Sequence, residues 1–333
     1  MKKNILVTGG CGFIGGAFLE YLLKKNNYKV SNMDKVTYAS SNRNYLLKYK
    51  NYNLFQKDIR NISACRYVIN KTKPNVIVHF AAETHVDNSI KSPKIFLDTN
   101  IIGTFNLLKE SMSYLKKNAL DKKNFLFIHI STDEVFGDIK NLKDSSFKEN
   151  TRYNPQNPYS ATKASADHLV RSFFNTYNFP SIILNCSNNY GPHQHKEKLI
   201  PKTIINAIQG KKIPIYGKGK NIRDWIYVED FARAIMKVAQ KGKIGDSYNV
   251  GSSNEIPNID MVKMICLEVD RQLSKKNSFK LVQFVKDRLG HDFRYSIDAS
   301  KIARDLKWSP KTALKKGIKK TVSWYIENVK IKK

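Results

Sequence analysis

The chain has 333 residues, 41% of them hydrophobic, and 58 Lys and Arg against 28 Asp and Glu give it a formal net charge of +30. This length suits a large α/β unit with a smaller second lobe, and no apolar run approaches the roughly 18 residues of a membrane span. The chain begins with a short strand and glycines rather than a signal-peptide core, so we expect a cytoplasmic protein with no membrane partner.

The positive charge favours anionic ligands, but its distribution argues against nucleic acid. Lysines occur in ones and twos, as at Lys24-Lys25 and Lys211-Lys212. There is no basic stripe interleaved with aromatic residues and no recognisable nucleic-acid module. We therefore interpret the charge as a solvated surface that helps to capture anionic metabolites, and we predict no nucleic-acid partner.

The cysteines indicate neither a metal site nor a disulfide framework. Cys11, Cys65, Cys186 and Cys266 lie far apart, with no CxxC pair and no interleaved histidine spacing. We expect four reduced thiols and no bound metal.

The first half of the chain alternates short apolar runs with longer amphipathic segments, which is typical of a parallel sheet covered by helices. The predicted strands are 5–7, 29–33, 54–56, 76–79, 125–130 and 182–184. The predicted helices are 14–25, 62–71, 95–117 and 158–177. A turn-rich stretch at 187–192 then indicates a second lobe, while 230–240 and 248–250 read as a helix and a strand that return to the sheet.

A glycine motif, Gly9-Gly10-Cys11-Gly12-Phe13-Ile14-Gly15, directly follows the first strand and opens the first helix. That context predicts a dinucleotide site, because glycines allow the backbone to approach a pyrophosphate at a helix N-terminus. Asp34 closes the second strand, where a carboxylate can accept the ribose hydroxyls and repel a 2′-phosphate, which favours NAD over NADP. Lys35 could weaken that discrimination, and the alternative is a tight turn with a capping aspartate.

These patterns predict an α/β fold: a Rossmann-type, doubly wound parallel sheet with a smaller, interleaved α/β substrate lobe. Residues 1–186 and about 225–250 would form the NAD-binding domain. Residues 187–224 and about 251–333 would form the lobe that binds the second substrate.

Tyr159 and Lys163 are a candidate oxidising pair. A phenol has a pKa near 10, so it needs a nearby cation to act as a base, and Lys163 lies one helical turn later on the same face. The same Tyr–Lys spacing occurs at positions 21 and 25 and at 67 and 71, but on earlier helices. Tyr159 instead begins the helix after the strand that ends in Ser131-Thr132, so both should reach the carboxyl edge of the sheet.

Asp133 and Glu134 follow that strand end and could form an elimination pair. One carboxyl group would take a carbon-bound proton while the other protonates a leaving hydroxyl. By themselves the two residues could equally be a helix cap or a turn. Next to an oxidising pair they favour a dehydration, because an epimerase or a simple dehydrogenase needs no such pair.

The glycine spacing resembles that of the extended short-chain dehydrogenase/reductases. Further motifs occur along nearly the whole chain: VTGGCGFIG (7–15), MDKVTY (33–38), AAETHVD (81–87), STDEVFG (131–137), PYSATKA (158–164), NCSNNYGP (185–192), EKLIP (197–201), PIYG (214–217) and RDWIYVED (223–230). In these motifs the chain closely resembles the dTDP-glucose 4,6-dehydratases.

The resemblance implies a three-stage reaction. Tyr159 would remove the proton of the glucose 4-hydroxyl, hydrogen-bonded also to Thr132, while hydride passes from C4 to NAD. Glu134 would then take the C5 proton while a protonated Asp133 gives its proton to the departing C6 hydroxyl. NADH would finally return hydride to C6, so that NAD is recycled and tightly held.

The resemblance also implies the residues that bind each ligand. The expected cofactor residues are Gly9, Gly12, Phe13, Ile14, Gly15, Asp34, Lys35, Thr37, Asp58, Ile59, Ala81, Ala82, Thr99, Ser131, Tyr159, Lys163 and Asn188. The expected nucleotide-sugar residues are Thr84, His85, Thr132, Asn188, Lys198, Leu199, Pro214, Tyr216, Arg223, Asn258, Arg288 and Tyr295. Arg223 and Arg288 would bind phosphate, for which planar guanidinium groups are suited, although either could form a surface ion pair instead.

Two departures from the family pattern leave the nucleotide base open between thymine and uracil. His195-Lys196 stands where an aromatic residue and a proline are expected, and Leu289 stands where a proline is expected. The sequence at 185–189 and the pair Asp224-Trp225 resemble the bacterial thymidine enzymes more than the uridine enzymes. Alternatives are a UDP-glucose 4,6-dehydratase, a nucleotide-sugar 4-epimerase or decarboxylase, and a catalytically silent NAD-sensing or nucleic-acid-binding protein.

Relatives of this fold form dimers through the helix near 95–117 and the helix that carries Tyr159. The resemblance therefore implies a homodimer with residues 104–108 in the interface. The same apolar face could instead be the ordinary core between helix and sheet.

Overall fold

The computed structural model describes residues 3–41, 43–118, 122–141, 143, 145–274 and 277–329. Over these residues it contains a parallel sheet of seven strands in the order β10-β6-β5-β4-β1-β2-β3. The strands are β1 (Lys3–Thr8), β2 (Tyr28–Asp34), β3 (Tyr52–Gln56), β4 (Val76–His79), β5 (Leu126–Thr132), β6 (Ser181–Cys186) and β10 (Ser247–Val250). The predicted doubly wound α/β class is confirmed, and the strand order reverses between β1 and β4, where such sheets bind ligands.

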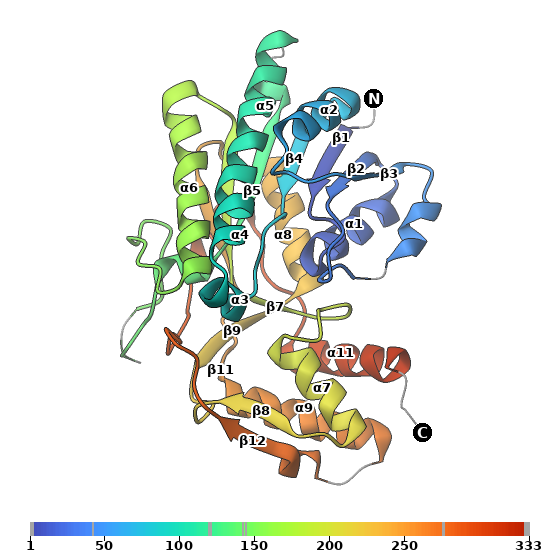
Figure 1. Ribbon diagram of the computed structural model, residues 1–333, viewed down its shortest axis with the longest axis vertical. Helices are drawn as coiled ribbons and strands as arrows, with labels where there is room; N and C mark the ends of the chain where they lie inside the picture. The colour runs from blue at the N-terminus through green and yellow to red at the C-terminus, as the bar shows by residue number, and fades with distance from the viewer. Residues whose placement is uncertain are drawn as a thin grey trace.

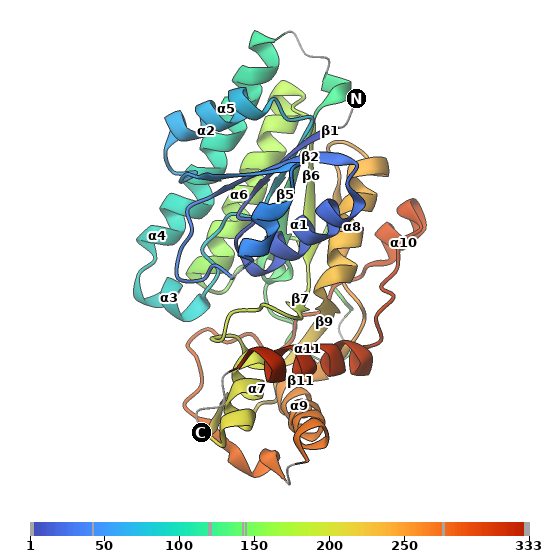
Figure 2. The same ribbon diagram turned by 90° about the vertical axis from the view of Figure 1, so that its right-hand side faces the viewer.

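Helices cover both faces of this sheet (Figures 1 and 2). On one face lie α1 (Phe13–Lys25) and α8 (Val228–Lys241), and on the other lie α2 (Ile62–Thr72), α5 (Thr104–Lys117) and α6 (Pro158–Tyr177). Successive β1 side chains enter opposite layers: Val7 packs in the core that contains Phe18 and Phe231, whereas Leu6 packs in the core that contains Leu107. No helix among the described residues is long and apolar enough to cross a membrane.

The helix that begins beside the active-site strand has a well-defined start. Asn157 and Ser160 form a capping box, and Pro158 occupies the first turn, where its missing N–H costs no helical hydrogen bond. This start fixes the position of Tyr159, the second residue of α6, relative to the end of β5.

The predicted helix 95–117 is interrupted by a π-helical segment. The structure contains α4 (Lys94–Phe96), the π segment η2 (Leu97–Gly103) and then α5. Within η2 the Asn100 side chain accepts a hydrogen bond from the Glu83 N–H at 2.8 Å and donates to the Glu83 carbonyl at 3.1 Å and to Thr162 Oγ1 at 2.9 Å. These tertiary bonds hold the segment after β4 against α6, and a helical periodicity does not reveal them.

A second lobe lies beyond the carboxyl edge of the sheet (Figure 1). Its strands are β7 (Asn188–Tyr190), β9 (Ile222–Tyr227) and β11 (Glu255–Pro257) in one sheet, and β8 (Ile213–Tyr216) and β12 (Val282–Val285) in another. Its helices are α7 (Leu199–Gln209), α9 (Asn258–Leu273) and α11 (Leu314–Asn328). The sequence predicted the lobe but none of these five short strands individually.

The remaining elements are short. They are α3 (Val86–Lys91), α10 (Ser300–Leu306), and the 3-10 turns η1 (Asn44–Lys48), η3 (Lys122–Asn124), η4 (Asp133–Phe136) and η5 (Ser278–Leu281). The strand predicted at 125–130 extends as β5 to Thr132, so Ser131 and Thr132 are its last residues. Because η4 directly follows β5, Asp133 and Glu134 lie at the carboxyl edge of the sheet, where such folds bind ligands.

Candidate active site

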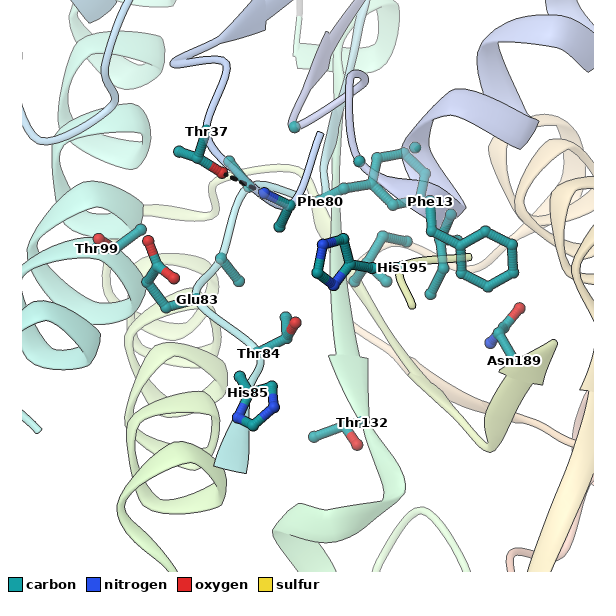
Figure 3. Close-up of a pocket in the computed structure, with 18 of the residues that line it drawn as sticks. Phe13, Thr37, Phe80, Glu83, Thr84, His85, Thr99, Thr132, Asn189 and His195 are labelled. Atoms are coloured by element: carbon teal, nitrogen blue, oxygen red, sulfur yellow. Dashed lines mark hydrogen bonds between the residues drawn. The ribbon is translucent and has the colours of Figure 1, made fainter. Parts of the chain in front are cut away.

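Two cavities meet at the carboxyl edge of the sheet, with volumes of about 330 Å³ and 280 Å³. Figure 3 shows Phe13 from α1, Thr132 from β5 and His195 from the loop after β7 around the first. All of the predicted cofactor residues line the first cavity. All of the predicted nucleotide-sugar residues line the second except Thr132, which lines the first. Thr84, His85, Glu134, Asn188 and Lys198 line both, so the cavities adjoin at the predicted reaction centre.

The glycine loop fits a dinucleotide phosphate because side chains would fill it. Gly9 has a φ of +75°, and a Cβ there would lie 2.6 Å from the Ala81 nitrogen. A Cβ on Gly15 would lie 2.4 Å from the Gly9 carbonyl oxygen. Gly12 caps α1 with no side-chain hydrogen bond, and the first helical residues, Phe13 to Gly15, line the cavity, so their N–H groups can serve an anion.

Asp34 is fixed at the end of β2 by two backbone donors. Its carboxylate accepts hydrogen bonds from the Cys11 N–H at 2.8 Å and the Val36 N–H at 2.7 Å, while burial raises its pKa. Each carboxylate oxygen can still accept another hydrogen bond, which suits ribose hydroxyls. The Lys35 ammonium lies 3.6 Å from the Asp58 carboxylate and so has an acidic partner on β3's side of the cavity.

Tyr159 and Lys163 are both buried, but the structure does not pair them directly. The Lys163 ammonium donates to the Ile130 carbonyl at 2.8 Å and lies 3.5 Å from His129 Nε2. Burial, followed by the Glu134 charge, raises the pKa of Tyr159 well above its usual range, and burial lowers the pKa of Lys163. Without a bound cation, Tyr159 is therefore a neutral phenol.

Asp167 is a buried carboxylate beneath this pair. It accepts hydrogen bonds from Ser131 Oγ at 2.8 Å and from the Tyr153 hydroxyl at 2.9 Å, and it lies 3.2 Å from His129 Nε2. Burial by itself would raise the pKa of Asp167, but His129, Lys163 and Ser131 together lower it. Asp167 thus supplies a negative charge that balances the buried Lys163 ammonium, a role that sequence spacing did not indicate.

Asp133 and Glu134 occupy different electrostatic environments. Asp133 is 1% exposed; one carboxyl oxygen accepts from Thr132 Oγ1 at 3.2 Å, and the other has no hydrogen-bond partner. Burial, followed by the charges of Glu134 and Asp224, raises the pKa of Asp133 well above its usual range. The surroundings of Asp133 therefore favour its protonated form, beside Glu134, which lines both cavities.

The two predicted phosphate-binding arginines are already engaged. Arg288 forms a bidentate pair with Asp87 at 2.6 Å and 3.0 Å, which joins the second lobe to α3. Arg223 donates to three backbone carbonyls, those of Ile222, Asp292 and Phe293, at 2.8–3.2 Å. Both line the second cavity, but a phosphate would have to share the guanidinium of Arg288 with Asp87.

Sequence reasoning left several lining residues out of the site. They are Tyr38, Asn189, Gln194 and Glu197 in the first cavity, with His195, and Asp87 and His291 in the second. Glu197 Oε2 lies 3.5 Å from His85 Nε2 and 3.4 Å from His195 Nδ1. The motif at 197–201 could have indicated Glu197, but only the fold shows that the loop before it crosses the cofactor cavity.

A parallel sheet of this order, with a glycine loop at its reversal point and a buried tyrosine and lysine one helical turn apart, is typical of the extended short-chain dehydrogenase/reductases. The family model described as GDP-mannose 4,6 dehydratase matches residues 6–321. dTDP-glucose 4,6-dehydratase 1 of Escherichia coli K12 is 47% identical, over 98% of this chain and 94% of that protein. The Neisseria gonorrhoeae dTDP-glucose 4,6-dehydratase is 46% identical, over 98% and 96%. The chain belongs to the dTDP-glucose 4,6-dehydratase family.

Solved structures agree over the whole fold. A Bacillus anthracis dTDP-glucose 4,6-dehydratase in complex with NAD superposes with a TM-score of 0.85 at 39% identity, covering 98% of this chain and 97% of that one. The Streptomyces venezuelae enzyme with NAD and dTDP bound gives 0.87 at 36% identity, covering 97% of each chain. A Thermotoga maritima UDP-glucose 4-epimerase also reaches 0.85, at 26% identity, covering 98% and 99%. The fold therefore does not separate dehydratase from epimerase.

We expect Asp133→Asn to raise the melting temperature by on the order of 3 °C at pH 8, because the amide removes a carboxyl that is costly to ionise when buried. The folded pKa of Asp133 is raised above the unfolded value of about 3.9. Neutral Asp133 therefore makes its full contribution to the free energy of unfolding below the unfolded pKa, and this contribution is lost as the pH rises through the folded pKa. The gain measured by differential scanning fluorimetry should therefore be small near pH 4 and grow toward pH 8.

The exposed Asp260, at the start of α9, offers a matched control. Asp260→Asn should change stability by less than about 0.5 kcal/mol at any pH. A gain for Asp133→Asn that does not depend on pH would contradict a protonated Asp133.

Proposed function

We propose that this chain is an NAD-dependent dehydratase that converts dTDP-glucose to dTDP-4-keto-6-deoxyglucose. The observation that carries this conclusion is the buried Asp133, with its raised pKa, beside Glu134, which lines both cavities. A 4-epimerase of the same fold needs the Tyr–Lys pair and the cofactor but no acid–base pair for eliminating water. UDP-glucose 4,6-dehydration is the alternative that keeps this chemistry.

The proposed cofactor is NAD. The close approach at Gly9, the uncapped start of α1 and the buried Asp34 carboxylate all fit a dinucleotide without a 2′-phosphate. When bound, NAD supplies the hydride acceptor for C4 oxidation and the donor for C6 reduction. Its positive charge would also favour the phenolate of Tyr159, whose pKa is raised in the protein alone.

Tyr159 and Thr132 serve the oxidation step. Tyr159 takes the proton of the 4-hydroxyl, and the Thr132 hydroxyl hydrogen-bonds the same oxygen. Lys163, held by the Ile130 carbonyl and balanced by Asp167, keeps a positive charge within the helix turn below Tyr159. The structure therefore supports an electrostatic role for Lys163 rather than a direct bond to the phenol.

Glu134 and Asp133 serve the elimination. The 4-keto group acidifies the C5 proton, which Glu134 takes as base. Asp133, protonated in its buried site, gives its proton to the departing C6 hydroxyl, so water leaves without a free hydroxide ion. Hydride return to C6 and reprotonation of C5 complete the cycle with no net use of NAD.

We further propose that residues 1–186 and about 225–250 hold NAD, and that 187–224 and about 251–333 hold the nucleotide sugar. The positions of the two cavities support this division. A cytoplasmic location is also proposed, because all four cysteines are free thiols, as expected in a reducing compartment.

The direct test is to incubate the purified protein with dTDP-glucose and with UDP-glucose, and to follow product mass and the absorbance of a 4-keto sugar in alkali. Loss of one water from dTDP-glucose without added cofactor is expected. Turnover of UDP-glucose only would overturn the thymidine assignment, a product of unchanged mass would indicate epimerisation, and no turnover with NAD added would contradict the proposal.

Glu134→Gln should separate oxidation from elimination. The amide cannot take the C5 proton, so kcat should fall by about 10²- to 10⁴-fold. Hydride transfer from C4 comes first, so NADH should still accumulate on the protein, visible by its near-ultraviolet absorbance. Tyr159→Phe is the control and should form no NADH. Full turnover by Glu134→Gln would exclude it as the base.

We also propose a homodimer, on the basis of an exposed apolar surface on η2 and α5. Leu97 is 47% exposed, Ile102 is 49% exposed and Phe105 is 36% exposed. Within the predicted interface 104–108, however, Leu107 and Leu108 are fully buried in the chain's own core, so that part of the expectation is wrong for these two side chains.

Ile102→Glu should convert the dimer to a monomer, because it places a charge in a surface that burial would desolvate. Analytical ultracentrifugation over a concentration series would measure the mass. Phe284→Glu, at a 56% exposed position on β12 in the other lobe, should leave the mass unchanged. A wild-type protein that stays monomeric at all concentrations would refute the proposed dimer.

A further inference from the structure

Three side chains form a hydrogen-bonded line that leads away from Glu134 into the second lobe. The Tyr295 hydroxyl lies 3.4 Å from Glu134 Oε2, and it donates a short hydrogen bond to Asp292 Oδ2. Asp292 is only 3% exposed and Tyr295 is 4% exposed. A second buried carboxyl group is thus connected to the proposed base through one phenol, and the dehydration described above does not use it.

This line lacks one proton. A phenol has a single hydroxyl proton, and here it stands between two carboxyl groups that can only accept when both are ionised. When the hydroxyl proton points at one carboxylate, no hydrogen lies between the Tyr295 oxygen and the other carboxylate. One additional proton, on either carboxyl group, completes both hydrogen bonds. The arrangement therefore favours the uptake of a single proton.

We propose that Asp292, acting through Tyr295, shares with Glu134 the proton that Glu134 removes from C5 of the sugar. This inference rests on the proposed function. Asp292 touches no reacting atom, so it is a positioning residue for that proton and not a catalytic residue.

The steps balance without a further reactant. The C5–H bond breaks, its proton joins Glu134, and its electron pair forms the C5–C6 double bond as the C6–O bond breaks. The proton on Glu134 then passes to the Tyr295 oxygen while the Tyr295 proton passes to Asp292. While Tyr295 and Asp292 hold the two protons, these protons can exchange with solvent, and the reverse movement then returns a proton to Glu134 for delivery to C5.

The surroundings of Asp292 adjust it to this task. Burial raises the pKa of Asp292 to about 6, and the charges of Glu134 and Asp138 act in the same direction. The Tyr295 hydrogen bond and the Arg223 guanidinium act in the opposite direction. At neutral pH Asp292 is therefore mostly ionised and able to accept a proton. Its pKa lies close enough to neutral pH that the proton can also leave again.

The backbone around Asp292 is held independently of its carboxyl group. Asp138 accepts hydrogen bonds from the Phe293 N–H at 2.7 Å and the Arg294 N–H at 3.0 Å. Arg223 donates to the Asp292 carbonyl at 2.8 Å and stacks on the Tyr295 ring at 4.1 Å. Replacing the Asp292 carboxyl by an amide therefore removes the proton acceptor while these anchors stay in place.

The test is a single turnover of unlabelled dTDP-glucose in D₂O, with deuterium at C5 of the product measured by mass and NMR. In the wild-type protein the C5 proton that has passed to Tyr295, which lines the second cavity, exchanges with solvent deuterium before the movement reverses, so the product should carry deuterium at C5. In Tyr295→Phe and Asp292→Asn the C5 proton stays on Glu134, and the deuterium fraction should fall at least twofold. An unchanged fraction in both variants would overturn the proposal.

Two variants control for structural effects. Asp138→Asn alters the turn that carries Asp292, and Tyr153→Phe removes a different phenol that binds a buried carboxylate, that of Asp167. Both should keep the wild-type deuterium fraction. An equal fall in Asp138→Asn would assign the effect to the turn and would also overturn the proposal.

A pH series on the wild-type protein decides the matter if the variants form no product. Asp292 can accept only when ionised, so the deuterium fraction should fall at least twofold between pH 8 and pH 5, passing its midpoint near pH 6. A fraction that is constant across this range would contradict the proposal. Failure of the proposed function is distinct, because the wild-type protein would then form no keto sugar at any pH.

Discussion

The parallel register of β1, β4 and β5 is the constraint on which the site depends. It places Thr8 opposite His79 and His79 opposite His129. Thr8 Oγ1 lies 2.7 Å from His79 Nδ1, and His129 continues the buried polar row toward Asp167. A shift of one residue would turn these side chains to the other face and would leave them buried without partners. The ends of the three strands, and the loops that form both cavities, are positioned by this row.

The pKa values of two buried carboxyl groups, those of Asp167 and Asp133, are shifted in opposite directions. Asp167 has a lowered pKa because His129, Lys163 and Ser131 outweigh its burial. Asp133 has a raised pKa because burial and the charges of Glu134 and Asp224 outweigh the Arg223 charge and the Thr132 hydrogen bond. The folded chain therefore favours the ionised form of Asp167, near Tyr159 and Lys163, and the protonated form of Asp133, in the wall of the first cavity. Both residues are aspartates, so the difference in pKa comes from the neighbouring groups of each carboxyl and not from the residue type.

The comparison with an epimerase structure of similar fold shows where function is decided. Both share the sheet, the loop and the overall path of the chain at a TM-score of 0.85. Catalytic differences within such a fold come from a few side chains at the cavity wall. The side chains proposed for this role here are Asp133 and Glu134, and the proposal extends to Tyr295 and Asp292, which come from the second lobe.

By itself the sequence determined the parallel fold, the glycine loop and Asp34 at the end of β2, because these follow from local periodicity and motif spacing. The residues expected to bind each ligand came from the resemblance to a known family, and they line the two cavities. The sequence could not show the π segment at Leu97–Gly103, the five short strands of the second lobe, or the loop that carries His195 over the first cavity. Nor could it show that Lys163 bonds the Ile130 carbonyl, that Arg288 pairs with Asp87, or that Asp292 reaches Glu134 through Tyr295. Ile130 and Lys163 are 33 positions apart in the chain, Glu134 and Tyr295 are 161 apart, and Asp87 and Arg288 are 201 apart. Only tertiary packing decides these contacts, because burial and partners, which set each pKa, are properties of the folded chain.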